Sequence, residues 1–279
     1  MRPAYAKVNL WLNVVGRRDD GYHLLESLVA FVDLADAVAV RPGRVLSLEI
    51  DGPYGAALAA ERDNLVLKAA RRLAEHVGRP AHAEIHLTKR IPLAAGLGGG
   101  STDAAAALRE LVELWGVSLS EQGLLEIGRV LGADVPMCLY GRTALASGVG
   151  ERLTPAPALP SAAILLVNPG AALATRDVFA ARTGAFSQSI PPSRSWSSVS
   201  DLAQDMARHG NDLTDAATSL CPAIGDVLAA LRTARQARYA GMSGSGATCF
   251  AIFDSVDAAR SAAASLPAAW WRHAGRFVG

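Results

Sequence analysis

The sequence predicts a fold of the α/β class, because strand patterns and helix patterns alternate along its 279 residues. In residues 6–14, aliphatic and polar side chains alternate, which is the period of a strand with one buried face. Residues 82–87 alternate in the same way. Residues 101–115 are rich in alanine, and their apolar side chains recur at helical spacing, so a helix follows the second strand.

The other elements follow from the same two periods and from turn residues between them. Strands are also predicted over residues 28–40, 45–50, 162–168 and 247–253. Helices are also predicted over residues 64–77, 120–131, 224–237 and 258–266. Ser120 suits an N-cap, as do the residues Ser101–Asp103 at the start of their helix. The polar, proline-containing segment 187–200 is predicted to be a surface loop.

Length and composition indicate a globular protein of about two domains. The chain is 51% hydrophobic and 19% charged, which is enough apolar material for a sizeable core. Residues 154–161 are rich in proline and alanine and are the predicted boundary. We therefore expect an N-terminal domain over residues 1–156 and a C-terminal domain over residues 157–279.

Charge and cysteine usage narrow the classes of function. A formal net charge of +1 argues against a nucleic-acid-binding protein, which would concentrate basic residues. The 3 cysteines form no C-x-x-C pair and fit a reducing compartment. No signal peptide and no apolar run long enough for a membrane span is visible, so a cytoplasmic location without membrane contact is expected.

A cluster of glycines precedes the helix at 101–115 and is a candidate anion site. Gly96 and Gly98–Gly100 allow close backbone approach to a ligand, and the following helix presents unpaired N–H groups. Ser101 and Thr102 add hydroxyls. The segment matches neither the Walker loop nor G-x-G-x-x-G, and a flexible turn before a helix is the alternative. Asp103 would repel a phosphate, so its carboxylate is expected to point away, toward the helix start or a cation.

Four segments are similar, in the same order, to motifs of one kinase superfamily. Pro92–Ala105, PLAAGLGGGSTDAA, resembles the phosphate loop of galactokinases, homoserine kinases, mevalonate kinases and phosphomevalonate kinases. Ala6–Ser27, Leu131–Pro136 and Gly241–Phe250 resemble signatures of the 4-diphosphocytidyl-2-C-methyl-D-erythritol kinases within that superfamily. Ala94-Ala95 departs from the usual loop, in which at least one glycine is common, so a stiffer start of the loop is expected.

The resemblance implies an α/β (α+β) two-domain small-molecule kinase fold. Its N-terminal domain would carry the ATP loop, its C-terminal domain would be ferredoxin-like, and the active site would lie in the cleft between them. The implied activity is phosphorylation of the 2-hydroxyl of 4-diphosphocytidyl-2-C-methyl-D-erythritol, in the non-mevalonate route to isoprenoid precursors. The implied cofactors are ATP and Mg²⁺, with unassigned metal ligands. The implied partner is a small molecule carrying a cytidine diphosphate group, bound by a monomer or homodimer.

The same resemblance assigns the phosphate-binding and catalytic residues. The ATP loop would consist of Pro92, Leu93, Ala94, Ala95, Gly96, Leu97, Gly98, Gly99, Gly100, Ser101 and Thr102. Asp134 would be the general base, and Lys7 would keep its carboxylate ionised. From the residues alone, an aspartate in a turn is more often a cap and a lysine on a strand is more often solvated.

Substrate-binding residues are carried over from the Ala6–Ser27 signature and from a shorter match at residues 174–179. Tyr22 and Phe179 would stack on the two faces of the cytosine, and His23, Thr175 and Asn9 would make polar contacts. Two further features have open interpretations. The Asn211-Asp212 pair is either structural or close to the substrate. The glycine-rich turn at 244–246 either closes over the ligand or is a tight turn before a strand.

Three other functions are disfavoured by the sequence. His82, Glu84 and His86 share one strand face but lack the further ligands that a zinc site usually needs. A serine hydrolase would need a G-x-S-x-G elbow, which is missing. An inactive nucleotide-binding module would be expected to lose Lys7, Asp134 or the glycine loop, and all three are intact.

Overall fold

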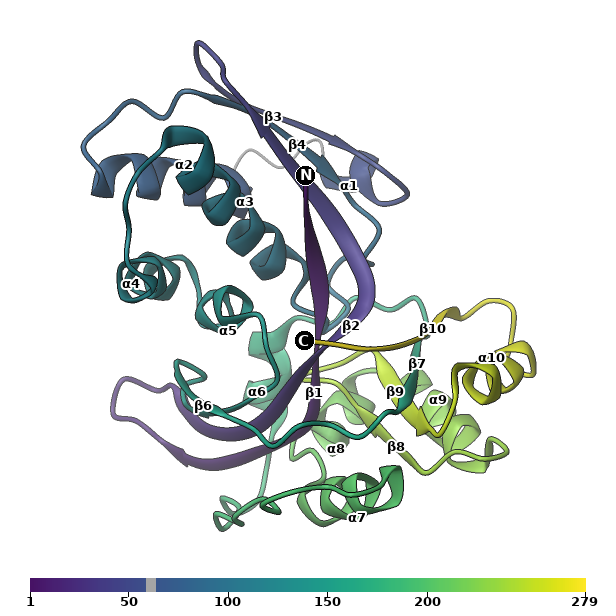
Figure 1. Cartoon of the computed structure of the whole chain (residues 1–279). Helices are drawn as coiled ribbons and strands as arrows, with labels where there is room; N and C mark the ends of the chain where they lie inside the picture. Colours follow the sequence, from purple (N-terminus) through teal and green to yellow (C-terminus); the bar gives the residue numbers. More distant parts are fainter. Residues whose placement is uncertain (59–63) are drawn as a thin grey trace. The chain divides into compact units, whose positions relative to one another are not determined.

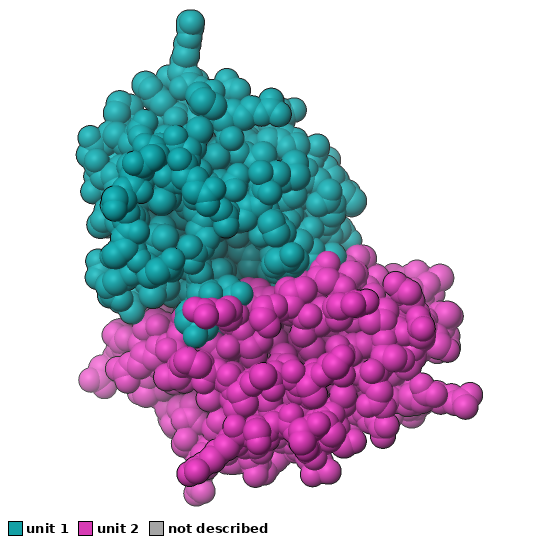
Figure 2. Space-filling model, viewed as in Figure 1, with its two compact units in different colours: residues 1–7, 34–93, 98–141 teal, residues 8–33, 94–97, 142–279 magenta. Residues whose placement is uncertain are grey.

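In a computed structural model, which describes residues 1–58 and 64–279, two long strands contribute to two compact units (Figures 1 and 2). These strands are β1 (Arg2–Arg17) and β2 (His23–Arg41). Unit 1 contains residues 1–7, 34–93 and 98–141, and unit 2 contains residues 8–33, 94–97 and 142–279. Both strands and the glycine segment contribute residues to each unit. Neither unit is therefore one continuous stretch of the chain. The division into domains at residues 156 and 157 stays a prediction.

In its described residues, unit 1 combines a small sheet with five helices. The strand β4 (Ala83–Thr88) pairs antiparallel with the second half of β2 and parallel with β3 (Leu46–Asp51). The helices are α1 (Gly55–Leu58), α2 (Leu65–His76), α3 (Gly99–Trp115), α4 (Glu121–Leu131) and α5 (Val135–Tyr140). Figure 1 shows α2 and α3 side by side, next to these strands.

The core of unit 1 explains the alanine-rich sequence of α3. Four consecutive alanines of α3, residues 104–107, are buried, and small side chains let this helix lie close to its neighbours. Leu73 of α2, Ile85 of β4 and Leu108 of α3 fill the space between the helices and the sheet. The position of the helix that starts at the glycine segment is therefore fixed by burial along its length.

Unit 2 contains an antiparallel sheet in the order β10-β7-β9-β8. The strands are β7 (Ala163–Asn168), β8 (Tyr239–Met242), β9 (Cys249–Phe253) and β10 (Trp271–Val278). The helices are α6 (Thr175–Ala181), α7 (Val199–His209), α8 (Thr214–Leu220), α9 (Ala223–Thr233) and α10 (Val256–Ala264). With α9 before β8 and α10 before β10, this is the ferredoxin-like βαββαβ arrangement that the resemblance implies. The first half of β2 also pairs with β5 (Ala144–Gly148), which pairs with β6 (Arg152–Pro155).

The predicted α/β class and each predicted helix and strand are confirmed, with shifts at their ends. The Ser120 hydroxyl caps α4 by accepting a hydrogen bond from the Gly123 N–H. The prediction that Ser101–Asp103 starts α3 is wrong, because Gly98 at φ 64° precedes the helix and these residues lie within it. The strand β10 was not predicted, since Arg272, His273 and Arg276 interrupt its apolar pattern. No helix in the described ranges combines the length and the apolar character needed to cross a membrane.

Truncation of Leu108 tests the core of unit 1. Leu108 is 0% exposed, so Leu108→Ala should lower the free energy of unfolding by about 2–5 kcal/mol through lost burial and a residual cavity. Denaturant unfolding measures this loss. Val130→Ala is the matched control in the same unit, because Val130 is 64% exposed and its truncation should leave stability nearly unchanged. Equal losses for the two variants would contradict the placement of this core.

Candidate functional site

The glycine segment adopts backbone conformations that explain its composition. Gly96 and Gly98 have φ angles of 73° and 64°, in the left-handed region that glycine tolerates best. Ala94 also has a positive φ, of 49°, which is strained for a residue with a Cβ atom. The start of the loop therefore carries an alanine where glycine would be relaxed, in agreement with the expectation of a stiffer segment.

In unit 2, the second glycine-rich turn packs against Gly96. A Cβ atom at Gly96 would lie 2.5 Å from the Gly246 carbonyl oxygen and 2.9 Å from that of Ser243. The Ser243 hydroxyl donates to the Gly96 carbonyl at 3.1 Å, and the Thr248 N–H donates to the Ala95 carbonyl at 3.3 Å. The turn at 243–246 thus holds the loop directly, a role that neither interpretation of its sequence included.

Two asparagines fix this turn in place. The Asn9 N–H donates to the Ser243 hydroxyl at 3.1 Å, and its side-chain amide donates to the Ser27 hydroxyl at 2.7 Å. The Asn211 amide donates to the carbonyl oxygens of Met242 and Gly244, at 2.8 and 2.9 Å. Asn211 is therefore structural, as one interpretation of the Asn211-Asp212 pair predicted. The substrate role of Asn9 stays a prediction.

In unit 1, Gly98 of the glycine segment contacts Lys7, which in turn pairs with Asp134. A Cβ atom at Gly98 would lie 3.2 Å from the Lys7 Cβ and 3.3 Å from its Cε. Lys7 is 5% exposed, so the alternative of a solvated lysine is wrong. Its Nζ lies 3.2 Å from Oδ2 of Asp134. The start of α3, the ammonium and the carboxylate are thus brought together within one unit.

Asp134 directly precedes α5 without serving as its cap. Among the described residues, its side chain accepts no hydrogen bond from the N–H groups of that helix. The side chain is 49% exposed, so the carboxylate that contacts Lys7 remains accessible. Asp134 is thus a fixed carboxylate beside a cation, and it lies at the start of a helix with free N–H groups. Such a carboxylate can accept a proton close to a bound anion.

A second set of charges near the loop was not identified from the sequence. The Lys89 ammonium donates to the carboxylates of Asp36 and Asp103, and all three side chains are buried. The expectation that Asp103 meets a cation is confirmed. Burial, strengthened by the Asp36 charge and opposed by Lys89, raises the pKa of Asp103 to about 8. The available signal in the sequence was a charged residue, Asp36, within the apolar strand predicted over residues 28–40.

The predicted cytosine-binding residues lie in unit 2, and two of them contact each other. The His23 ring stacks on the Phe179 ring, with centroids 5.0 Å apart and planes at 22°. Tyr22 is 63% exposed. His23, rather than Tyr22, thus covers Phe179. The Thr175 hydroxyl lies 2.9 Å from that of Ser245.

The surroundings of His23 favour its neutral form. Partial burial lowers the pKa of His23, and the positive charges of Arg17 and Arg182 lower it further. A neutral imidazole has one donor and one acceptor nitrogen, which suits recognition of a nucleobase edge. The substrate roles of Tyr22, His23, Phe179 and Thr175 stay predictions.

The cysteines and histidines offer no metal site in the part of the chain that the structure describes. Residues 1–58 and 64–279 contain no group of three or more His, Cys, Asp or Glu side chains that could hold a metal ion. His86 instead pairs with Asp51 at 3.1 Å. Burial raises the pKa of the Cys138 thiol, and that of Cys249 to about 12, so both are neutral and unreactive at physiological pH.

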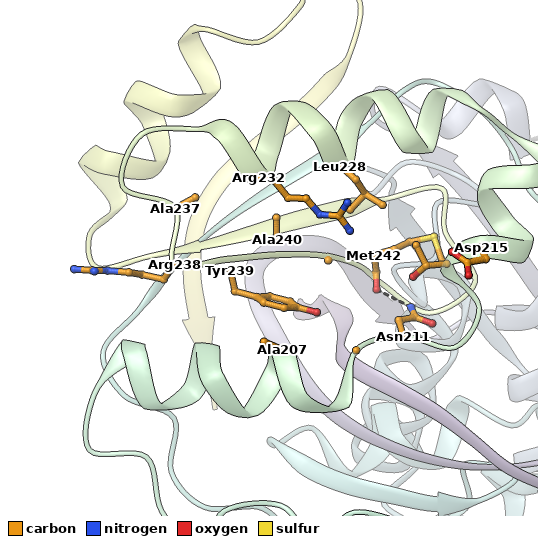
Figure 3. Close-up of a pocket in the computed structure, with 13 residues that line it drawn as sticks. Ala207, Asn211, Asp215, Leu228, Arg232, Ala237, Arg238, Tyr239, Ala240 and Met242 are labelled. Carbon is orange, nitrogen blue, oxygen red and sulfur yellow. Dashed lines mark hydrogen bonds between the residues drawn. The ribbon is translucent and has the colours of Figure 1, made fainter. Parts of the chain in front are cut away.

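A pocket of about 520 Å³ lies in unit 2, between α7, α9 and β8 (Figure 3). None of the predicted catalytic, phosphate-binding or substrate-binding residues is among the described residues that line it. Figure 3 shows Asn211 at its edge, hydrogen-bonded to the Met242 carbonyl. Asn211 therefore has two contacts of interest: it lines the pocket, and it supports the turn at 243–246 that holds the glycine loop.

Comparison with known sequences gives matches along nearly the whole chain. Residues 64–142 match the family described as the GHMP kinases N terminal domain, and residues 188–272 match the GHMP kinases C terminal family. A 4-diphosphocytidyl-2-C-methyl-D-erythritol kinase of Paramagnetospirillum magneticum is 49% identical, over 96% of this chain and 95% of the relative. The enzyme of that name from Gluconacetobacter diazotrophicus is 48% identical, over 99% and 94%.

Solved structures give the same result. The crystal structure of a 4-(cytidine 5'-diphospho)-2C-methyl-D-erythritol kinase has a TM-score of 0.82 and 39% identity, covering 100% of this chain and 99% of that chain. The crystal structure of L. major mevalonate kinase in complex with R-mevalonate has a TM-score of 0.67 and 17% identity, covering 99% of this chain and 96% of that chain. At this lower identity the likeness shows the fold alone.

Substitution of Gly96 tests the packing of the loop on the second glycine turn. Gly96→Ala should destabilise the protein and weaken nucleotide binding, because the new Cβ would collide with the Gly246 carbonyl oxygen. Thermal unfolding and ATP titration measure the two effects.

Gly78→Ala is the control for backbone strain. Gly78 has a φ of 66°, but a Cβ there would have no described atom within 4 Å, so only a loss of about 1–2 kcal/mol is expected. If Gly96→Ala behaved like Gly78→Ala in both measurements, the contact with the turn would not matter.

Proposed function

The chain belongs to the family of 4-diphosphocytidyl-2-C-methyl-D-erythritol kinases within the GHMP kinases, and we propose that it phosphorylates the 2-hydroxyl of 4-diphosphocytidyl-2-C-methyl-D-erythritol. As a member of this family it is an ATP-dependent small-molecule kinase. The name shared by relatives 46–49% identical supports the choice of substrate. The observation that carries the chemistry is the Lys7–Asp134 pair beside Gly98, at the start of α3.

In this proposal Asp134 is the general base. Its accessible carboxylate takes the proton of the attacking hydroxyl, and the oxygen then bonds to the γ-phosphorus while the bond to the β,γ-bridging oxygen breaks. Lys7 pairs with Asp134 and offsets the negative charge that develops on the hydroxyl oxygen. The fixed contact between the two side chains, with Lys7 buried, orients the base before the substrate arrives.

The phosphates of ATP would bind at the backbone of Pro92–Thr102. The first N–H groups of α3 have no partners inside the helix, and the helix dipole adds positive potential at the same end. Bound Mg²⁺ would neutralise phosphate charge during the transfer. We propose that the ion arrives with ATP, and we assign no ligands to it, since the described residues contain no preformed acidic cluster.

The cytidine part of the substrate would bind in unit 2. Aromatic side chains such as Phe179 and Tyr22 can stack on a base, while neutral His23 and Thr175 can pair with its polar edge. Since His23 covers Phe179 without substrate, the base either stacks on His23 or displaces it. The non-mevalonate route, a cytoplasmic location and a monomeric or homodimeric state remain parts of the proposal.

The role of Asp134 is tested by Asp134→Asn. This change keeps the size of the side chain but removes the proton acceptor, so turnover should fall by about 100-fold or more while ATP affinity stays within about twofold. Steady-state rates and ATP titration measure the two quantities. Asp257→Asn, at a side chain 93% exposed, is the matched control and should behave as the wild type. Near-normal turnover of Asp134→Asn would remove this residue from the mechanism.

The substrate is tested by a panel of alcohols. The wild type should consume ATP with 4-diphosphocytidyl-2-C-methyl-D-erythritol and not with homoserine or mevalonate. Phe179→Ala should raise KM for the cytidyl substrate by about 10-fold or more through lost stacking, with little change in KM for ATP. Comparable rates with all three alcohols, or an unchanged KM in Phe179→Ala, would count against the proposed substrate site.

A further inference from the structure

The buried charges at Asp36, Lys89 and Asp103 take no part in the proposed mechanism and require an explanation. Their exposed fractions are 0, 2 and 2%. Charged side chains are rarely buried to this extent, because removing them from water is costly unless partners compensate. All three belong to unit 1, and we call them the Asp36–Lys89–Asp103 cluster.

The cluster ties together three segments of the chain. The Lys89 ammonium, in the segment after β4, donates to Asp103 Oδ2 in the first turns of α3 at 2.7 Å and to Asp36 of β2. The other oxygen of Asp36 accepts hydrogen bonds from the N–H groups of Arg90 and Ile91. The residues just before the glycine segment are thereby fixed to the helix just after it.

Lys89 also determines which residue can occupy the start of α3. A Cβ atom at Gly99 would lie 2.8 Å from the Lys89 Nζ. The ammonium therefore fills the space beneath the first turn of the helix, where unpaired N–H groups begin. Lys89 supports the backbone that would hold the phosphates without itself being exposed to them.

The charges of the cluster balance only if it holds a proton. Two carboxylates and one ammonium have a net charge of −1, which is unfavourable in a buried site because the extra charge has been removed from water. Burial raises the pKa of Asp103 to about 8, and the Asp36 charge acts in the same direction while Lys89 opposes both. Oδ1 of Asp103 is buried and has no hydrogen-bond partner among the described residues, which also disfavours the ionised carboxylate.

Other titratable groups near the cluster do not replace this proton. Lys89 and Asp36 are the charged groups that act on the Asp103 carboxyl. Cys138 of α5 faces the same region, and burial keeps its thiol neutral. Cys138 also experiences the charges of Lys7 and Asp134, but these two pair with each other.

We propose that Lys89 and Asp103 are positioning residues of the phosphate loop, in a cluster that is electrically neutral only while it keeps one proton. This inference rests on the proposed role of the loop in binding ATP. As the pH rises through the ionisation of Asp103, a net negative charge appears beneath the N–H groups of α3 and repels the phosphates. ATP binding therefore weakens in alkaline solution, while the proton-accepting step at Asp134 is not directly affected.

The test compares ATP dissociation constants of the wild type and Asp103→Asn between about pH 7.5 and about pH 9.5, above the last ionisation of the phosphates themselves. Asparagine keeps the shape and hydrogen bonds of the carboxyl but cannot ionise. The wild-type dissociation constant should rise about three- to tenfold over this range, and that of Asp103→Asn should change less than about twofold. The same difference in pH dependence between the wild type and Asp103→Asn should appear in KM for ATP and not in KM for the cytidyl substrate.

Asp51→Asn is the matched control, because Asp51 is an exposed aspartate of the same unit, paired with His86. It should keep the wild-type pH dependence. A wild-type dissociation constant that does not change with pH, or the same change in wild type and Asp103→Asn, would overturn the inference. A wild type that binds no ATP at any pH would instead overturn the proposed function.

Lys89→Arg is a second test variant, and it keeps the positive charge of the side chain. The guanidinium is too large for the space beneath Gly99, so KM for ATP should rise about fivefold or more with little change in kcat. An unchanged KM for ATP in this variant would contradict the positioning role. Thermal unfolding of each variant establishes that the folded protein is measured, and Lys89→Arg provides the decisive comparison if Asp103→Asn does not fold.

Discussion

Three glycines of one short loop are each in close contact with a different part of the fold. Gly96 meets the turn at 243–246, Gly98 meets the Lys7 side chain, and Gly99 meets the Lys89 ammonium. No residue with a Cβ atom fits at Gly96 or Gly99 without a shift of its neighbours, and Gly98 leaves little more room. Steric exclusion of side chains thus determines where the candidate phosphate site can form, and the surrounding elements are arranged to satisfy these contacts.

The charges around the loop fall into two groups with different environments. Asp134 is half-exposed and held by Lys7, so it combines a fixed orientation with access to a ligand. Asp103 is buried and held by Lys89, so it shapes the loop but cannot reach a substrate. In our proposals the same pair of side-chain types, a lysine and an aspartate, serves chemistry in one case and positioning in the other, and burial distinguishes the two.

The sequence resemblance and the physical patterns identified different things. The alternating and helical periods located six of the ten strands and five of the ten helices in the described residues, because burial of one face imposes these periods locally. The motif resemblance identified the family and the glycine segment, which periodicity could not interpret. Neither source identified Lys89 and Asp36 as partners of Asp103, since the three residues lie in different segments and no local motif links them.

The sequence by itself determined the α/β class, the family and the residues available for phosphate binding, because these depend on local period and local motif. Only the tertiary structure decided that Asn211 and Ser243 hold the loop, that His23 covers Phe179, and that α3 begins at Gly99. These outcomes depend on contacts between distant segments, whose distances and burial are set by packing of the whole unit. A sequence pattern does not contain those distances, so it could name the side chains without assigning their partners.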